Sequence, residues 1–376
     1  TVTEETLGAR GVFIKIIKQN AVLIIAAVAA VISCFFVPPD SGYADYFDLR
    51  TLVSLFCMMI VVSAMRHIGL FRFLAQKIVR VFRTTRSAIT ALVFVTYAAS
   101  MLIANDMALI TFLPLGYFVL TATGKEKHMA FTFIMQTIAA NLGGMLTPFG
   151  NPQNLYIYNY FNIPTGEFFG IMWPPTLISV ALIAVCCLFV KSEPLDRSDK
   201  KNVTTDKKRT AVYLVMFVYA IIIVFRAVPY WTGLVMVPIL LFLDRKALVD
   251  VDYGLLLTFC MFFVFSGNMA RIPAVDSFFR NLLAQNTLLT GVLSCQIISN
   301  VPSAILLSGF TTDYAALLMA VNIGGCGTLI SSMASLISYK HFAIYRPAEV
   351  KKYLLMAHGL NFGFLALLTG ACLLLA

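Results

Sequence analysis

Charge is what this sequence has least of. Charged side chains make up 12% of the 376 residues, whereas 60% of the residues are hydrophobic. A typical soluble domain has about 25% charged residues, so this composition excludes an ordinary soluble globule. The net charge of +10 comes from basic residues in a few loops beside apolar runs, which is typical of membrane topology and not of nucleic-acid binding. We expect an all-α polytopic protein of the lipid bilayer, with no nucleic-acid partner.

Motifs for enzymatic and metal chemistry are also missing. The sequence has no H-E-x-x-H motif and no pair of intramembrane aspartates, so we expect no enzyme. The eight cysteines are scattered through apolar runs without zinc-ligand spacing, and indicate small reduced hydrophobic residues. The four histidines lie near the ends of apolar runs, where interfacial residues are commoner than metal ligands. We expect no cofactor apart from a bound Na⁺.

One stretch concentrates Gly, Pro, Asn and Thr against this apolar background, from Asn141 to Phe161 (NLGGMLTPFGNPQNLYIYNYF). As a single helix, the apolar run over 128–161 would be roughly 50 Å long, whereas the hydrocarbon core is ~30 Å thick. Two prolines and a glycine between Thr147 and Pro152 disfavour helix, so we predict a broken helix over 129–161. Irregular backbone at membrane depth must be buried in protein or line a cavity. The break is therefore a candidate binding site.

The same stretch occurs again in the second half of the chain. Residues 321–342 align with 140–161 without a gap, and 7 of the 22 positions are identical, including an N-x-G-G-x-x-T frame that begins at Asn141 and at Asn322. Interrupted apolar segments at corresponding places in two halves indicate the binding site of a secondary transporter. We predict inverted-topology repeats, each with a re-entrant helical hairpin and a broken transmembrane helix.

The pattern of apolar runs and loop charges predicts the order of the segments. The first repeat is 1–190, with spans 21–37 and 49–65, hairpin 88–121, broken helix 129–161 and span 168–190; a cytoplasmic linker, 191–210, and an extra span, 211–228, come next; the second repeat is 229–376, with hairpin 288–310 and broken helix 314–342. Lys15 and Lys18 precede a run long enough to span, so we expect no cleaved signal peptide.

Positive charge changes sides between equivalent loops. Residues 66–87 carry six basic side chains and no acid, whereas 270–287 carry two basic side chains and one acid. The positive-inside rule places the first of these segments in the cytoplasm, and the extra span inverts the orientation of every later segment. We therefore expect a multi-pass protein of the cell inner membrane, with its N-terminus in the cytoplasm and its C-terminus outside.

The hairpin tips and the broken helices together resemble a known family. A hairpin with an Asn at its tip, then N-x-G-G-x-x-T-P-x-G-x-P-x-N, then an inverted copy, resembles the ion transporter superfamily, which includes arsenite permeases and divalent anion:sodium symporters. ANDMALITFLPL at 104–115 and TPFGNPQN at 147–154 are most similar to the arsenite-permease-like branch. The symporters typically have Ser-Asn-Thr at both tips, whereas this chain has A-N-D at 104–106 and S-N-V at 299–301. The resemblance covers nearly the whole chain.

The resemblance implies two cation sites around one substrate site, and a homodimer. The cation sites would comprise Asn105, Asp106, Asn141, Gly144 and Thr147 in the first repeat, and Asn300, Asn322, Gly325 and Thr328 in the second. The substrate site would comprise Asn105, Asn151, Asn154, Asn300, Ser303, Ser331 and Ser332. Elementary chemistry agrees, because unwound carbonyls suit a hard cation and half-helix N-termini favour an anion. No Lys or Arg is predicted at this depth, which favours a small or singly charged anion or a neutral oxyacid.

We interpret the protein as a secondary active transporter of a small anion or oxyacid, a carboxylate or an arsenite-like species, coupled to Na⁺ or H⁺. Asp106 is the one acid predicted deep in the membrane, where a carboxylate is costly, and it indicates a cation ligand or a proton carrier. The structural alternative is a protonated acid that caps the second hairpin helix. A Na⁺/H⁺ antiporter on the same scaffold, with Asp106 carrying the exchange, is the alternative function.

Overall fold

The computed structural model describes residues 21–79, 82–195 and 206–375. Within these residues the chain forms helices and no strand. Six helices are long and apolar enough to cross a membrane: Leu49–His67, Asn105–Ala122, Glu126–Leu146, Thr165–Leu188, Arg245–Ala270 and Pro347–Leu374. The prediction of an all-α polytopic membrane protein is confirmed. The predicted cytoplasmic segment 1–20 and the middle of the linker lie outside the described residues.

The helices of the first half are α2 Ala21–Phe36, η2 Ser41–Tyr46, α3 Leu49–His67, α4 Leu70–Val79, α5 Thr85–Ser100, α6 Asn105–Ala122, η3 Glu126–His128, α7 Met129–Gly143, η4 Gly144–Leu146, α8 Pro152–Tyr160 and α9 Thr165–Leu188. Those of the second half are α10 Lys207–Val224, η5 Tyr230–Val235, α11 Met236–Leu243, α12 Arg245–Val249, α13 Tyr253–Ala270, α14 Pro273–Gln285, α15 Thr287–Ile298, α16 Asn300–Ser308, α17 Tyr314–Ile323, α18 Met333–Tyr345, η6 Pro347–Glu349 and α19 Val350–Leu375.

Corresponding helices begin with the same cap. Asp48 accepts a hydrogen bond from the backbone N–H of Thr51 at 3.0 Å at the start of α3. Asp252 accepts one from the backbone N–H of Leu255 at 3.0 Å at the start of α13. A side-chain oxygen in this position satisfies one of the orphan donors of the first turn. These two helices occupy equivalent places in the predicted repeats.

Glu193, in the segment after α9, contacts both ends of the helix pair α5–α6. Its carbonyl oxygen accepts the backbone N–H of Thr85 at 2.8 Å, and its carboxylate lies 2.6 Å from the Lys125 ammonium and 2.8 Å from that of Lys127. These lysines lower the pKa of the Glu193 carboxyl to about 2. A lowered pKa means that the ion pairs stabilise the fold at neutral pH and lose that contribution as the pH falls toward about 2. The start of α5 and the end of α6 therefore lie at the same end of the molecule.

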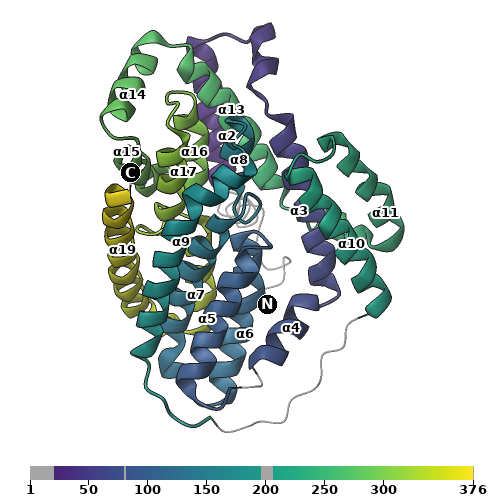
Figure 1. Cartoon of the computed structure of the whole chain (residues 1–376), viewed down its shortest axis with the longest axis vertical. Helices are drawn as coiled ribbons and strands as arrows, with labels where there is room; N and C mark the ends of the chain where they lie inside the picture. Colours follow the sequence, from purple (N-terminus) through teal and green to yellow (C-terminus); the bar gives the residue numbers. More distant parts are fainter. Residues whose placement is uncertain (1–20, 80–81, 196–205, 376) are drawn as a thin grey trace, which may run out of the picture.

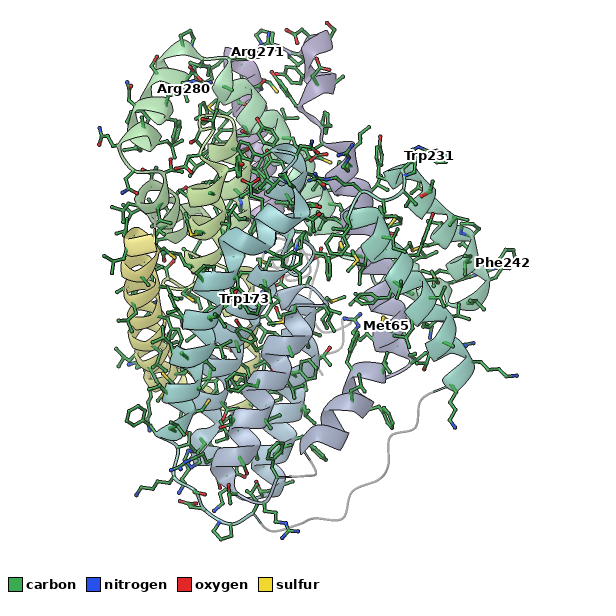
Figure 2. The ribbon with its side chains drawn as sticks, viewed as in Figure 1. Met65, Trp173, Trp231, Phe242, Arg271 and Arg280 are labelled. Atoms are coloured by element: carbon green, nitrogen blue, oxygen red, sulfur yellow. The ribbon has the colours of Figure 1, made fainter. Side chains whose placement is uncertain are left out.

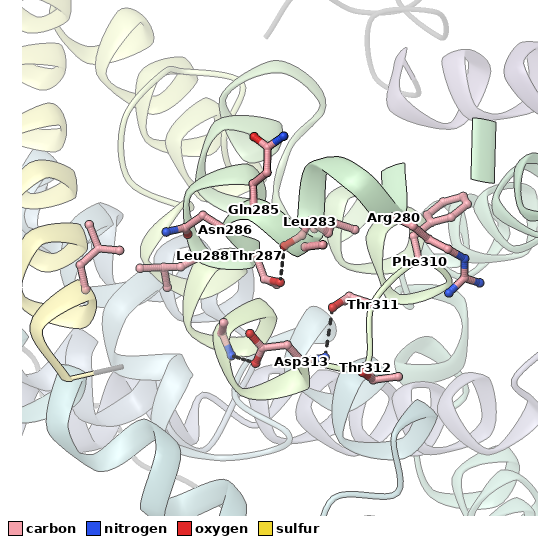
Figure 3. A pocket seen from close by; sticks show the side chains of 13 residues that line it. Arg280, Leu283, Gln285, Asn286, Thr287, Leu288, Phe310, Thr311, Thr312 and Asp313 are labelled. Atoms are coloured by element: carbon pink, nitrogen blue, oxygen red, sulfur yellow. Dashed lines mark hydrogen bonds between the residues drawn. The ribbon is translucent and has the colours of Figure 1, made fainter. Parts of the chain in front are cut away.

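The helix pair α15–α16 also has its two ends together, around a cavity of about 470 Å³. Figure 3 shows residues 285–288, from the turn into α15, facing residues 310–313, from the turn after α16. Two of its polar groups bond locally: Thr287 donates to the carbonyl of Leu283 at 3.0 Å, and Asp313 accepts the N–H of Ala316 at 3.1 Å. The cavity thus marks the open end of this pair.

The open ends of the two helix pairs lie toward opposite ends of the molecule. Figure 1 places α14, which leads into α15, at the upper end, and α5 and α6 in the lower half. Helices α10 and α11 lie on the right side with α3, and α19 lies on the far left. Opposed open ends support the inverted-repeat prediction, which stays a prediction together with the orientation of the chain in the membrane.

The outer surface is apolar. Trp173, Trp231 and Phe242 have exposed fractions of 53%, 62% and 88%, and Figure 2 shows Trp231 and Phe242 at the outer edge of the helices α10 and α11. Exposed apolar side chains on so many helices are costly in water and favourable in a lipid bilayer. The periphery of the fold is thus suited to the hydrocarbon core.

Arg226, just beyond α10, contacts the far end of α8. Its guanidinium donates to the backbone carbonyls of Tyr158 and Ile163 and lies 3.9 Å from the centroid of the Tyr158 ring. A cation at a helix C-terminus satisfies orphan carbonyls and complements the helix dipole. The extra span therefore holds one end of the first broken helix.

Cysteine labelling tests the hairpin interpretation of α5–α6. We expect cysteines substituted at Thr84 and Lys125 to react with a membrane-impermeant thiol reagent from the same side, because Glu193 bridges their neighbourhoods. A cysteine at Thr312, at the open end of α15–α16, is the matched control and should react from the opposite side. Opposite-side labelling of positions 84 and 125 would show that this region crosses the membrane, and would end the hairpin interpretation.

Candidate functional site

Two broken helices pack against each other in the interior of the protein. In the first, the chain leaves α7 at Gly143 and resumes in α8 at Pro152; in the second, it leaves α17 at Ile323 and resumes in α18 at Met333. Prolines and glycines disfavour helix at the first break. The flanking asparagines and serines are almost entirely buried, so the two irregular segments lie within the protein, as irregular backbone at membrane depth must.

The two breaks make the same contact twice, once from each half. The Asn141 side-chain amide donates to the Ser332 hydroxyl at 2.9 Å, and the Asn151 side-chain amide donates to the side-chain oxygen of Asn322 at 3.2 Å. In the gapless alignment, Asn141 corresponds to Asn322 and Asn151 to Ser332. The asparagine before each break therefore bonds the first capping position after the opposite break. This reciprocity supports the predicted two-fold relation.

Asn141 joins the tip of the first hairpin to the second break. Its carbonyl oxygen accepts the amide of Asn105 at 3.0 Å, and its own amide also donates to the carbonyl of Gly325 at 3.2 Å. Asn105 in turn accepts the backbone N–H of Asp106 at 2.9 Å. Hydrogen bonds thus connect the first hairpin tip (Asn105), the first break (Asn141) and the second break (Ser332).

The second hairpin tip meets its own break through backbone contacts. Asn300 accepts the N–H of Val301 at 2.9 Å, as Asn105 does with its own neighbour, and its backbone N–H donates to the carbonyl of Ser331 at 3.0 Å. The Ser331 hydroxyl donates to the carbonyl of Gly325 at 2.9 Å. Ser299 adopts a φ of 76°, a strained conformation for a residue with a side chain, at this sharp turn.

Two threonines fasten the breaks to the hairpins in the same way. The Thr147 hydroxyl donates to the carbonyl of Met101 at 2.6 Å, and the Thr328 hydroxyl donates to the carbonyl of Gln296 at 3.0 Å. Met101 and Gln296 each lie four residues before the tip asparagine. Both threonine hydroxyls, predicted as cation ligands, thus hydrogen-bond to the hairpins.

Four helix N-termini converge on this network. Helices α6, α8, α16 and α18 begin at Asn105, Pro152, Asn300 and Met333, and α16 packs against α8 while α18 packs against α6. Each N-terminus carries roughly half a positive charge and unsatisfied N–H groups. The hydrogen bonds that connect the starts of these helices involve amides, hydroxyls and backbone groups, without a charged side chain. The helix dipoles thus contribute positive potential here, and the hydrogen bonds between the helix starts use no basic side chain.

Several buried acceptors at these helix starts have no partner. Asp106 Oδ1, Asn151 Oδ1 and Gln153 Oε1 are each buried and accept no hydrogen bond. Buried polar atoms are almost always paired, so unpaired acceptors at a candidate site point to a ligand or water that donates to them. Gly144 packs against Asn151 and has no room for a Cβ there, so the turn requires glycine at this position.

The carbonyls predicted to bind cations surround side-chain amides. Asn154 donates its amide to the carbonyls of Gly144, Met145 and Thr147, each at 3.1 Å. In the second break, the amide of Gln296 donates to the carbonyls of Gly324 at 2.9 Å and Cys326 at 3.1 Å. The breaks therefore have the freed carbonyls that the sequence predicts, but each set faces a nitrogen from this chain.

Ser303 lies apart from the other predicted residues. It is fully buried, and its hydroxyl is 2.8 Å from that of Ser294, so it joins the two arms of the α15–α16 pair. Three relevant residues were not predicted. Gln153 is one of the buried acceptors without a partner. Gln296 is a polar residue in an apolar hairpin arm, which could have drawn attention to it. Arg66, assigned from sequence to an inner surface segment, reaches within 3.9 Å of the Met107 sulfur in the first turn of α6.

A cavity of about 30 Å³ separates the first turns of α6 and α8 from α3. Its apolar lining includes Ala104 and Met107 from the first hairpin and Met58 and Val62 from α3. This volume accommodates about one water molecule. A larger molecule could occupy this place only if α3 and the hairpin tip moved apart.

Comparison with known proteins decides the family. A family model described as citrate transporter matches residues 11–316. The chain belongs to the citrate transporter family. This family lies in the ion transporter superfamily that the sequence resembles, whereas assignment to the arsenite-permease-like branch stays a prediction. The citrate transporter family is one of transporters and not of enzymes.

Relatives of this transporter come from distant organisms. It is 32% identical over 296 residues to an uncharacterized transporter of Methanocaldococcus jannaschii, covering 78% of this chain and 81% of that protein. It is 29% identical over 320 residues to the inner membrane protein YbiR of Escherichia coli, covering 81% and 83%. It is 28% identical over 176 residues to a silicon efflux transporter of Oryza sativa subsp. japonica, covering 46% and 36%. The transporter is therefore a multi-pass membrane protein, and its similarity to a transporter and to an inner membrane protein extends over most of the chain.

Replacing Asn141 tests its role as the bridge between the halves. We expect Asn141→Ala to lower the free energy of unfolding by about 1–3 kcal/mol, because it leaves buried partners in both halves unpaired. The matched control is Asn361→Ala, since Asn361 is also buried but makes a single bond, to the carbonyl of Ala357 at 2.8 Å on its own helix. Thermal unfolding of the purified variants measures both. Equal losses in the two variants would contradict the bridging role.

Proposed function

We propose that this member of the citrate transporter family is a secondary active transporter of a small oxyacid or singly charged anion, carboxylate or arsenite-like, driven by a cation gradient of H⁺ or Na⁺. The observation that carries the proposal is the convergence of four helix N-termini on a cluster of uncharged amides and hydroxyls. Such a cluster offers N–H donors for oxyanion or acid oxygens, with a positive potential from the helix dipoles.

The unpaired acceptors support a substrate that carries hydroxyl groups. Asp106 Oδ1, Asn151 Oδ1 and Gln153 Oε1 lack donors, and a fully ionised carboxylate has none to offer. A protonated oxyacid has both hydroxyl donors, which suit such acceptors, and oxygen acceptors, which suit the N–H groups of the helix N-termini. Unpaired acceptors therefore favour protonated oxyacids over multiply charged carboxylates.

The charge of the surroundings agrees with a substrate of low charge. The basic side chain that reaches the first turn of α6 is Arg66, which lies 3.6 Å from Asp250. A tricarboxylate would need several cations beside it, because burying unpaired charge is costly. The name of the rice relative, a silicon efflux transporter, is consistent with an oxyacid substrate, and the family description, citrate transporter, with a carboxylate.

Transport into proteoliposomes tests the proposal. The panel crosses arsenite, silicate, borate, acetate, succinate and citrate with imposed H⁺ and Na⁺ gradients. We expect the neutral oxyacids or singly charged anions to move at least tenfold faster than succinate and citrate. Transport of only the multiply charged carboxylates would contradict the proposed substrate class. Cation exchange without movement of any of these solutes would replace the proposal with the Na⁺/H⁺ antiporter.

Asp106 is proposed to couple transport to the cation gradient. Its unpaired Oδ1 lies at the start of α6 beside the Asn105–Asn141 pair. We expect Asp106→Asn, which keeps the shape of the side chain and one acceptor oxygen but has no proton to release, to abolish H⁺-driven uptake while substrate exchange between preloaded vesicles stays within about twofold of wild type. Gradient-driven uptake that equals wild type at every pH and Na⁺ concentration would remove Asp106 from the coupling.

A further inference from the structure

We propose that the two unwound loops are closed to Na⁺, because the side-chain amides of Asn154 and Gln296 occupy the places that Na⁺ would take among the freed carbonyls. The resemblance to sodium-coupled relatives implies Na⁺ at these loops, and the residues present do not fit it. This inference concerns the coupling ion and therefore rests on the proposed transport function. The experiment below measures Na⁺ binding in the absence of substrate, so this inference and the proposed transport function can fail independently.

The first loop is built around the Asn154 amide. Its nitrogen lies 3.1 Å from each of three carbonyl oxygens, of Gly144, Met145 and Thr147, and the side chain is fully buried. Its oxygen accepts the amide of Asn322 at 2.5 Å. Carbonyl oxygens only accept hydrogen bonds, so the atom that faces the three of them must be the nitrogen. An N–H donor therefore lies at the centre of this cluster of three carbonyls.

The second loop is built around Gln296, which comes from a different element. Its amide nitrogen donates to the carbonyls of Gly324 and Cys326, and its oxygen accepts the N–H of Thr328 at 2.8 Å. Gly327 has a φ of 121°, and a Cβ at this position would collide with the Gln296 side chain. Glycine at this position thus allows the loop to wrap around the glutamine.

A hard cation would need a different environment. Hard cations bind oxygen at shorter distances, about 2.3–2.6 Å for Ca²⁺, and are repelled by N–H donors. To bind Na⁺, each loop would have to expel its amide, and that amide would lose two or three buried hydrogen bonds, each of which is costly to leave unmade. The same solution appears in both halves from unrelated positions, one on α8 and one on α15. The loops are thus closed in both repeats.

Thermal unfolding in matched salts tests this inference on the purified full-length protein. We expect the wild-type Tm to be the same in NaCl, KCl and choline chloride at equal ionic strength. Asn154→Asp places a second acceptor against three carbonyls, so this variant should have a lower Tm in choline chloride. NaCl should restore much of that loss, because a cation can then fill the oxygen-lined space, whereas choline is too large.

A second variant and a control complete the design. Gln296→Glu makes the same change in the second loop and should show the same rescue by NaCl if Asn154→Asp does not fold. Asn361→Asp is the matched control, because the buried Asn361 amide bonds a single helix carbonyl; its Tm should not depend on Na⁺. A wild-type Tm that rises in NaCl and not in choline chloride, with the rise abolished by Asn154→Ala, would overturn the inference. A lowered Tm in both acidic variants that NaCl does not restore would also overturn the inference.

Discussion

Backbone carbonyls released where two helices break inside a membrane protein must find donors within the protein, and the centre of this structure is organised by that requirement. Water is scarce at this depth and an unpaired carbonyl is costly. Asn154 and Gln296 supply amide donors to the freed carbonyls. Ser331 and Asn141 both donate to Gly325. Each of these residues comes from a different helix or loop, so satisfying the breaks also fixes how the two halves fit together.

The two halves meet this requirement with different residues at the same places. The capping position after the break is Asn151 in one half and Ser332 in the other, yet each bonds the asparagine before the opposite break. The donor to the freed carbonyls comes from α8 in the first half and from α15 in the second. The breaks require a hydrogen-bond donor at a given position, but not a particular residue, because any side-chain amide of sufficient reach can donate to the freed carbonyls.

The sequence predicts where the helices break better than it predicts which groups hydrogen-bond to the freed backbone. Pro148 and Gly150, and the glycines that come after Asn322, mark segments that are outside α-helix in the structure, because proline removes a backbone donor and glycine favours irregular backbone. The partners of those segments depend on tertiary contacts. Gln296 corresponds in register to Met101, an apolar residue, so the comparison of the two halves hides its role. Ser303 is one turn from a hairpin tip, yet it faces the other arm of its hairpin.

A site made of helix N-termini and amides can hold a singly charged substrate without a bound cation. Four N-termini of roughly half a charge each supply about two positive charges, more than one anionic charge requires. A neutral oxyacid would use the same N–H groups as donors and offer its hydroxyls to the unpaired oxygens of Asp106 and Asn151. If the loop carbonyls are filled by the amides of this chain, the charge balance of loading rests on these dipoles and on the protonation of Asp106.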